Sequence, residues 1–137
     1  MLGDKIGTFQ GKVTGQRVLP PEGEHPKFET TAELSGTILG VAARIIGTYW
    51  SVVQSDGTLY GENPGQSVTI TEDGAQGLFW ASGVGKFTGQ GTAVSFRGVL
   101  YYRGASGPLA RLNGLAVVYE WDVDEHGQGQ LSLWEWK

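Results

Sequence analysis

The sequence predicts an all-β fold, a closed antiparallel up-and-down β-barrel of about eight strands. Apolar and polar residues alternate along most of the chain, and turn residues interrupt the alternation at fairly regular intervals. Glycine accounts for 23 of the 137 residues, set between Val, Ile, Thr, Tyr, Phe and Trp, as is typical of twisted, tightly turned β-structure. No segment has a helical period that would serve a parallel crossover, so neighbouring strands are expected to be antiparallel.

The predicted strands follow one another along a single domain, residues 1–137. Thr30, Ala32 and Leu34 illustrate the pattern, since they share one face of their segment. The last segment carries Trp134 and Trp136, which are too apolar for a frayed end, and we expect it to pair with the first and close the barrel. The alternating segments are 5–19, 27–36, 37–54, 58–62 continued by 66–72, 75–87, 92–103, 108–124 and 128–137.

Turn chemistry predicts the connections between these segments. The Pro-rich stretch 20–26 is expected to be the one long loop. Asp-Gly pairs at 56–57 and 73–74 predict hairpin turns, because this pair accepts the positive φ angles that such turns need. Further turns are expected at 104–107 and 124–127, and bends or bulges at Gly40 and Gly47.

Composition excludes several classes of function. A net charge of −4 without a basic cluster is unfavourable for nucleic-acid binding, which depends on neutralising phosphates. The chain has no cysteine, and the spacing of its two histidines, His25 and His126, supports no zinc site, so neither metal nor cofactor is expected. No apolar run is long enough for a signal peptide or a membrane span, and we expect a cytoplasmic protein without membrane contact.

The glycine-rich stretch "GVGKFTGQGTAVSFRG" (83–98) raises the question of a phosphate-binding loop. A P-loop needs Ser or Thr after Gly-Lys, but Phe87 follows Gly85-Lys86. A dinucleotide fingerprint needs a third glycine where Thr88 stands, and a helix where a strand is expected. We therefore interpret the stretch as a strand and a turn, in which Gly83 and Gly85 leave room on one strand face for a bulky neighbouring ring.

The same stretch resembles a hairpin motif of the allene oxide cyclase and dirigent-like barrels. The matching residues are Ser82, Gly83, Gly85, Phe87, Gly89 and Gly91. Most of the chain also resembles a group of small bacterial proteins of unassigned function that share this barrel, through "GTYWSVVQSDGTLYGE", "GVGKFTGQG", "LARLNGLAVVYEWDVD" and "LWEWK". The resemblance implies an eight-stranded, calycin-like barrel, oligomerisation and an apolar lumen, and it transfers no catalytic residue.

Candidate site residues are the aromatic and charged side chains of the strands. Glu33, Glu120 and Glu135 stand among apolar neighbours, a setting that raises a carboxyl pKa towards values useful in acid–base chemistry. The favoured interpretation is structural, namely salt bridges to Arg44, Arg97 or Arg103. The candidate ligand-binding residues are Tyr49, Trp50, Trp80, Arg97, Tyr102, Tyr119, Glu120 and Trp121.

Both faces of several strands are apolar, and this favours a homodimer or homotrimer that covers part of the outside. An eight-stranded barrel has an interior just wide enough for side chains or one small ligand. The preferred function is therefore binding of a small apolar or amphipathic molecule in the lumen. Two alternatives stay open, a cofactor-free isomerase or cyclase and a packed structural or interaction module. A one-residue error in register would exchange the inner and outer faces.

Overall fold

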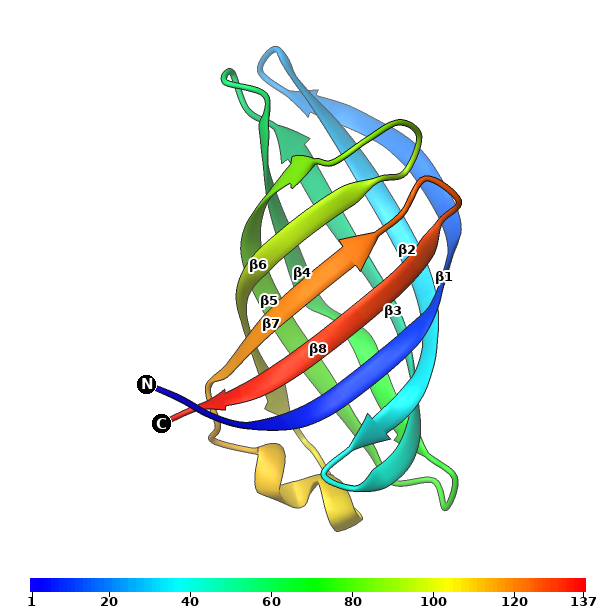
Figure 1. Ribbon diagram of the computed structural model, residues 1–137, viewed down its shortest axis with the longest axis vertical. Helices are drawn as coiled ribbons and strands as arrows, with labels where there is room; N and C mark the ends of the chain where they lie inside the picture. Colours follow the sequence, from blue (N-terminus) through cyan, green and yellow to red (C-terminus); the bar gives the residue numbers. More distant parts are fainter.

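The computed structural model describes residues 1–137, and its strands form one closed antiparallel barrel in chain order (Figure 1). The last strand pairs with the first, with Gly129 opposite Gly11 and Ser132 opposite Thr8. The predicted fold class and barrel closure are thus confirmed. The elements are β1 (Leu2–Glu22), β2 (His25–Ile38), β3 (Val41–Val53), β4 (Thr58–Thr71), β5 (Gln76–Phe87), β6 (Val94–Arg103), the 3₁₀-helix η1 (Gly107–Leu112), β7 (Val117–Val123) and β8 (Gln128–Trp136).

Alternate residues of each strand point into the barrel and form one apolar core. On β7 the inward residues are Val117, Tyr119, Trp121 and Val123, each less than 9% exposed. On β6 the inward face includes Phe96, Leu100 and Tyr102. The remaining large core residues include Phe9, Leu34, Ile38, Ile45, Leu59, Phe79, Leu131 and Leu133.

The Pro-rich stretch 20–26 is not the long loop that the sequence predicts. Strand β1 continues through both prolines to Glu22, which pairs with His25 across the two-residue turn Gly23–Glu24. Pairing of β1 with β8 ends at Lys12, so Pro20 and Pro21 lie where β1 has no neighbour on its other side. A strand edge without a partner needs no N–H donor, and that is where proline is tolerated in sheets.

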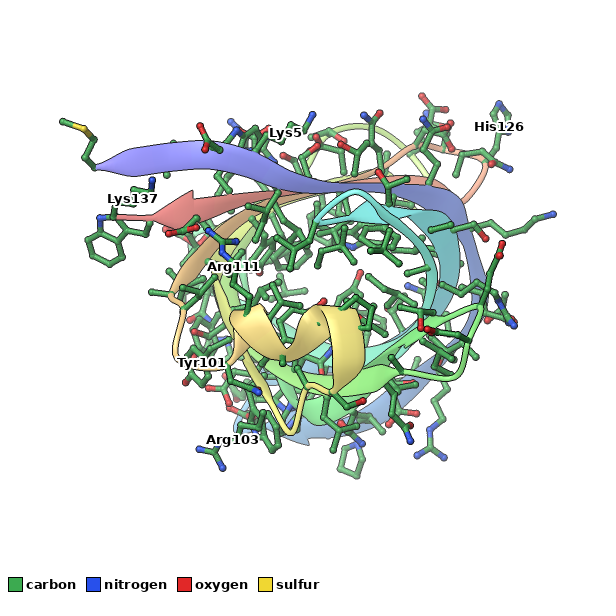
Figure 2. The ribbon with its side chains drawn as sticks, turned by 90° about the horizontal axis from the view of Figure 1, so that it is seen from below. Lys5, Tyr101, Arg103, Arg111, His126 and Lys137 are labelled. Carbon is green, nitrogen blue, oxygen red and sulfur yellow. The ribbon has the colours of Figure 1, made fainter.

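The segment 108–124 is also not one strand, since its first part forms η1. Pro108 begins this helix, and Leu109 and Leu112 from it are fully buried. The helix lies across the lower end of the barrel (Figures 1 and 2). Removing a buried leucine side chain typically costs about 2–5 kcal/mol, so these residues hold η1 firmly as a plug. No helix of the chain combines the length and the apolar character that crossing a membrane requires.

Two glycines expected at bends or bulges have different roles. Gly40 (φ 75°) forms the turn between β2 and β3 together with Leu39 (φ 51°). Gly47 begins a bulge, because the register between β3 and β4 shifts after its pair with Ser67 and resumes at Trp50 opposite Glu62. The bulge lies where "NPGQ" (63–66) interrupts β4, so the two segments expected there belong to one strand.

Several other glycines are required because neighbouring backbones approach closely. A Cβ on Gly98 would overlap the Ser82 carbonyl oxygen and lie 2.6 Å from the Gly83 Cα. In the same way, a Cβ on Gly11 would overlap the Glu33 carbonyl oxygen, and a Cβ on Gly36 would overlap the Thr8 carbonyl oxygen. Because the clashing atoms belong to the backbone of the adjacent strand, a side chain could not be accommodated by a change of rotamer.

We therefore predict that Gly98→Ala lowers the free energy of unfolding by about 1–3 kcal/mol, the range of a forced backbone shift in a packed structure. Gly15→Ala is the matched control, since its nearest foreign atom would be the Thr31 Cβ at 4.0 Å. That control should change stability by less than about 1 kcal/mol. Urea unfolding followed by circular dichroism measures both, and equal effects would contradict the prediction.

The outer face of the barrel carries an apolar stripe. Val99, Val118 and Trp134 lie opposite one another on β6, β7 and β8, and Trp80 on β5 lies opposite Tyr101 on β6. Tyr101 is 47% exposed and points away from the barrel (Figure 2). The expected homodimer or homotrimer stays a prediction, and this stripe is the surface it would bury.

Light scattering after size exclusion tests that prediction. We expect a mass two or three times the 14.7 kDa of the chain. Tyr101→Lys should lower the mass towards that of a monomer, because it places a charge on the stripe. Val18→Lys, at a 74% exposed position on β1, should leave the mass unchanged. A monomeric mass for the unmodified chain would contradict the prediction.

Candidate functional site

Two cavities occupy the barrel lumen. The inner chamber, about 80 Å³, lies in mid-barrel. The vestibule, about 150 Å³, lies towards the end of the barrel that carries the β5–β6 loop. Below the inner chamber the lumen is filled by Tyr102, Leu133 and the two leucines of η1. The inner chamber is lined by Ala32, Leu34, Ile45, Gly47, Tyr49, Gly61, Glu62, Asn63, Ser67, Phe79, Ala81, Phe96, Leu100, Tyr119, Trp121 and Leu131.

Tyr49 and Phe96 border both cavities and form the partition between them. Their rings meet edge to face, with centroids 5.8 Å apart. The Trp121 indole Nε1 donates a hydrogen bond to the Tyr49 hydroxyl oxygen at 3.1 Å. Edge-to-face pairs stabilise by about 0.5–1.5 kcal/mol beyond their buried area, so the partition is ordered and of modest strength.

Glycines in the wall keep the lumen open despite its large aromatic rings. A Cβ on Gly83 would overlap the Tyr119 hydroxyl, and one on Gly129 would overlap the Trp121 ring. A Cβ on Gly85 would lie 2.7 Å from the Phe96 ring. Each ring therefore lies against bare backbone. The space predicted beside Gly83 and Gly85 is confirmed, and those rings belong to Tyr119 and Phe96.

The two cavities differ in polarity. The inner chamber is mostly apolar, with a polar corner where the β4 bulge brings Asn63 and Ser67 into the wall. The Asn63 Oδ1 accepts a hydrogen bond from the Gln66 backbone N–H (2.8 Å), which orients the amide so that its Nδ2 donates to the Ser67 Oγ. The vestibule instead carries dispersed polar side chains: Gln16, Thr30, Ser51 and Thr92.

Burial keeps the inward tyrosines protonated. Desolvation raises the pKa of Tyr102 to about 12, partly offset by the hydrogen bond between its hydroxyl and that of Thr69. Desolvation also raises the pKa of Tyr119, and the proximity of Tyr49 and Tyr60 adds to that shift. The pKa of Tyr49 is raised by burial as well, against the lowering effect of its hydrogen bonds to Trp121 and Thr30. All three side chains are neutral at physiological pH, and the Tyr49 and Tyr102 hydroxyls form hydrogen bonds within the protein.

The structure brings three of the candidate ligand-binding residues together in the lumen: Tyr49, Tyr119 and Trp121 line the inner chamber. Tyr102 points inward as well, but it packs against Phe79 in the layer below. The other four candidates lie on the outer face. Trp50 contacts Tyr60 and Lys27, Trp80 contacts Arg103, and Arg97 and Glu120 face each other across β6 and β7.

The three candidate carboxylates form ion pairs. Glu33 pairs with Arg44 at 3.7 Å, and Glu120 pairs with Arg97 at 3.9 Å, both on the exposed outer face. Glu135 points inward near the plug and pairs with Arg111 of η1 at 2.6 Å. The favoured salt-bridge interpretation therefore fits all three, although Arg111 was not among the expected partners. No group of three or more His, Cys, Asp or Glu side chains is arranged to hold a metal ion.

Sequence reasoning missed Asn63, Ser67 and Phe96 as residues of the lumen. Alternation signals Phe96, which shares a face with Leu100 and Tyr102, but that face carries no polar group to attract attention. Asn63 is signalled only by its place before Pro64-Gly65, a pair that is typical of an interruption in a strand.

The comparisons with known proteins support the fold. No family model matches the chain, and no curated protein matches its sequence. A conserved protein of unknown function from Rhodopseudomonas palustris superposes with a TM-score of 0.80 and 10% identity, covering 98% of this chain and 97% of that one. A protein of unknown function from Clostridium acetobutylicum gives the same TM-score and identity, with 98% of both chains covered. The chain thus shares its barrel with proteins of unknown function.

The raised pKa of Tyr102 predicts a loss of stability at high pH. The unfolded chain loses this proton near pH 10, whereas the folded protein keeps it to about pH 12. The stabilising contribution is therefore complete below pH 10 and is lost between about pH 10 and 12, at about 1.4 kcal/mol per pH unit. Urea unfolding at pH 9 to 12 measures this loss. In Tyr102→Phe the slope should be shallower, and an unchanged slope would contradict the assignment.

Proposed function

We propose that the barrel binds a small apolar or amphipathic molecule in its lumen. The observation that carries this proposal is the pair of cavities that meet at Tyr49 and Phe96. Cavities lined by hydrophobic side chains with a few placed polar groups are typical of small-molecule sites. The wall glycines support the same conclusion. They let the rings of Phe96, Tyr119 and Trp121 lie close to the backbone of the wall, and this leaves space in the lumen.

The size and polarity of the cavities indicate how such a ligand lies. An apolar cavity of about 150 Å³ accommodates a benzene-sized molecule. A ligand that occupies both the vestibule and the inner chamber is somewhat larger than one ring, and it separates the edge-to-face contact of Tyr49 and Phe96. The apolar part fits the inner chamber, beside Leu34, Ile45 and Leu100. A polar group at the outer end of the ligand fits the vestibule, where Gln16 and Thr92 offer hydrogen bonds near the mouth of the barrel.

The resemblance to allene oxide cyclase-like barrels points the same way. It rests on the hairpin motif from Ser82 to Gly91, whose glycines Gly83 and Gly85 lie under the rings of Tyr119 and Phe96. In this proposal the chain is a barrel of that calycin-like type, with the motif serving to keep the lumen open. A cofactor-free cyclase acting there stays an alternative, but Arg97 and Glu120, which it would use, lie on the outer face.

Nuclear magnetic resonance titration with 1-hexanol tests the proposal. This probe has an apolar chain for the inner chamber and a hydroxyl for the vestibule. We expect the indole N–H signal of Trp121 to shift saturably, because that group lies at the partition. In Ala81→Leu the added side chain fills the inner chamber, and affinity for 1-hexanol should fall about tenfold or more.

Ala42→Leu is the matched control, because Ala42 lies exposed on the outer face of β3. It makes the same chemical change without altering the lumen, and binding should be unaffected. Ala32→Leu fills the inner chamber from β2 and gives an independent second variant. The proposal is wrong if the unmodified protein shows no saturable shift, or if both filled variants bind 1-hexanol as tightly as Ala42→Leu.

A further inference from the structure

The inner chamber is lined by a tyrosine whose hydroxyl has no hydrogen-bond partner within the protein. Tyr119 is 8% exposed, and it lines the chamber. The other two inward tyrosines differ, since the Tyr49 hydroxyl accepts from Trp121 and the Tyr102 hydroxyl is bonded to Thr69. The pKa of Tyr119 is raised by burial and by the neighbouring tyrosines, and no hydrogen bond contributes to this shift. Every fully enclosed side-chain N or O atom of the protein has a hydrogen-bond partner, so this hydroxyl without one borders open space, where a ligand group can reach it.

The fold positions this hydroxyl through a row of glycines. Gly61, Gly83 and Gly98 lie opposite one another on β4, β5 and β6, and Tyr119 follows them on β7. The Tyr119 side chain extends along this row until its hydroxyl reaches Gly83. A Cβ on Gly83 would overlap this hydroxyl, so the bare backbone at Gly83 gives the hydroxyl its place in the chamber wall.

The polar corner of the chamber, formed by Asn63 and Ser67, offers further hydrogen-bond donors. The Ser67 Oγ already accepts a hydrogen bond from Asn63, and the Asn63 Oδ1 already accepts one from Gln66. The remaining capacity of this pair includes two protons, the Ser67 hydroxyl proton and the second amide proton of Asn63, beside one lone pair on each oxygen. Both residues are buried, at 2% and 7% exposure, and both line the chamber.

An uncharged acceptor suits this environment better than an anion. No Lys, Arg or His lines the inner chamber, and the one charged residue at its border, Glu62, is a carboxylate beside the β4 bulge. A ligand carboxylate would lose its hydration without gaining a cation, which is costly in an apolar cavity. A carbonyl oxygen accepts hydrogen bonds while remaining neutral.

We propose that the inner chamber selects small uncharged carbonyl compounds, such as ketones, lactones or esters, through a hydrogen bond from the Tyr119 hydroxyl to the carbonyl oxygen. This inference rests on the proposed function, and it adds the chemical class of the ligand and the residue that recognises it. The apolar body of the ligand contacts the aliphatic and aromatic wall.

Two probes that differ at one atom position test the inference. Cyclopentanone and methylenecyclopentane have the same ring, with the carbonyl oxygen of one replaced by a CH₂ group in the other. Their affinities are measured from the Trp121 indole signal in the unmodified protein and in Tyr119→Phe. The affinity of the ketone relative to the alkene should fall about tenfold in Tyr119→Phe, the effect of one hydrogen bond.

Tyr102→Phe is the matched control, because it also removes a buried tyrosine hydroxyl, but one bonded to Thr69 below the chamber. It should leave the ratio of the two affinities unchanged. As a measurement that needs no variant, the infrared carbonyl band of bound cyclopentanone should lie at lower frequency than that of the ketone in hexane.

The outcomes separate this inference from the proposed function. If the ratio of affinities is the same in Tyr119→Phe as in the unmodified protein, or the carbonyl band does not shift, the inference is wrong while lumen binding stands. If methylenecyclopentane binds saturably and cyclopentanone does not, the inference is also wrong, and lumen binding again stands. If neither probe binds, and 1-hexanol does not bind either, both the inference and the proposed function fail.

Discussion

The structure depends on close contact between aromatic rings and wall positions that lack a Cβ. An eight-stranded barrel has little interior space, and this one points Phe96, Tyr119 and Trp121 into it. These rings leave room because Gly85, Gly83 and Gly129 allow them to lie against the backbone. The same constraint fixes the partition, since Phe96 lying on Gly85 is what meets Tyr49 edge to face. The inner chamber, the partition and the position of the Tyr119 hydroxyl all depend on these contacts between rings and glycines.

The fold was predictable because its signals are local. Alternation identified the strands, and Asp-Gly and related turns identified the hairpins. Asp124 illustrates this, since its carboxylate accepts hydrogen bonds from the backbone N–H groups of His126 and Gln128 as turn chemistry expects. The errors arose where tertiary context decides. Pro20 is tolerated in β1 because no strand pairs there on the side away from β2. The helix η1 forms because the open barrel end offers burial to Leu109 and Leu112.

The candidate site was less predictable, for a physical reason. Alternation shows that Tyr49 and Trp50 face opposite ways, but it does not show which faces the lumen when both are large and apolar. Trp50 and Trp80 instead cover the outside, where each meets a cation, Lys27 and Arg103 respectively. Depth along the barrel axis is equally hidden from the sequence. Tyr102 points inward as Tyr119 does, yet it lies in the layer that η1 closes.

The pairing of β1 with β8 has a consequence for how the chain reaches its folded state. This contact joins the most distant strands of the sequence, whereas every other strand pair joins neighbours. Contacts of such separation form slowly, because the whole intervening chain must first be ordered. The lumen has no complete wall until β1 pairs with β8. A ligand of the kind proposed would bind only the closed barrel, and it would therefore favour closure over an open sheet by mass action.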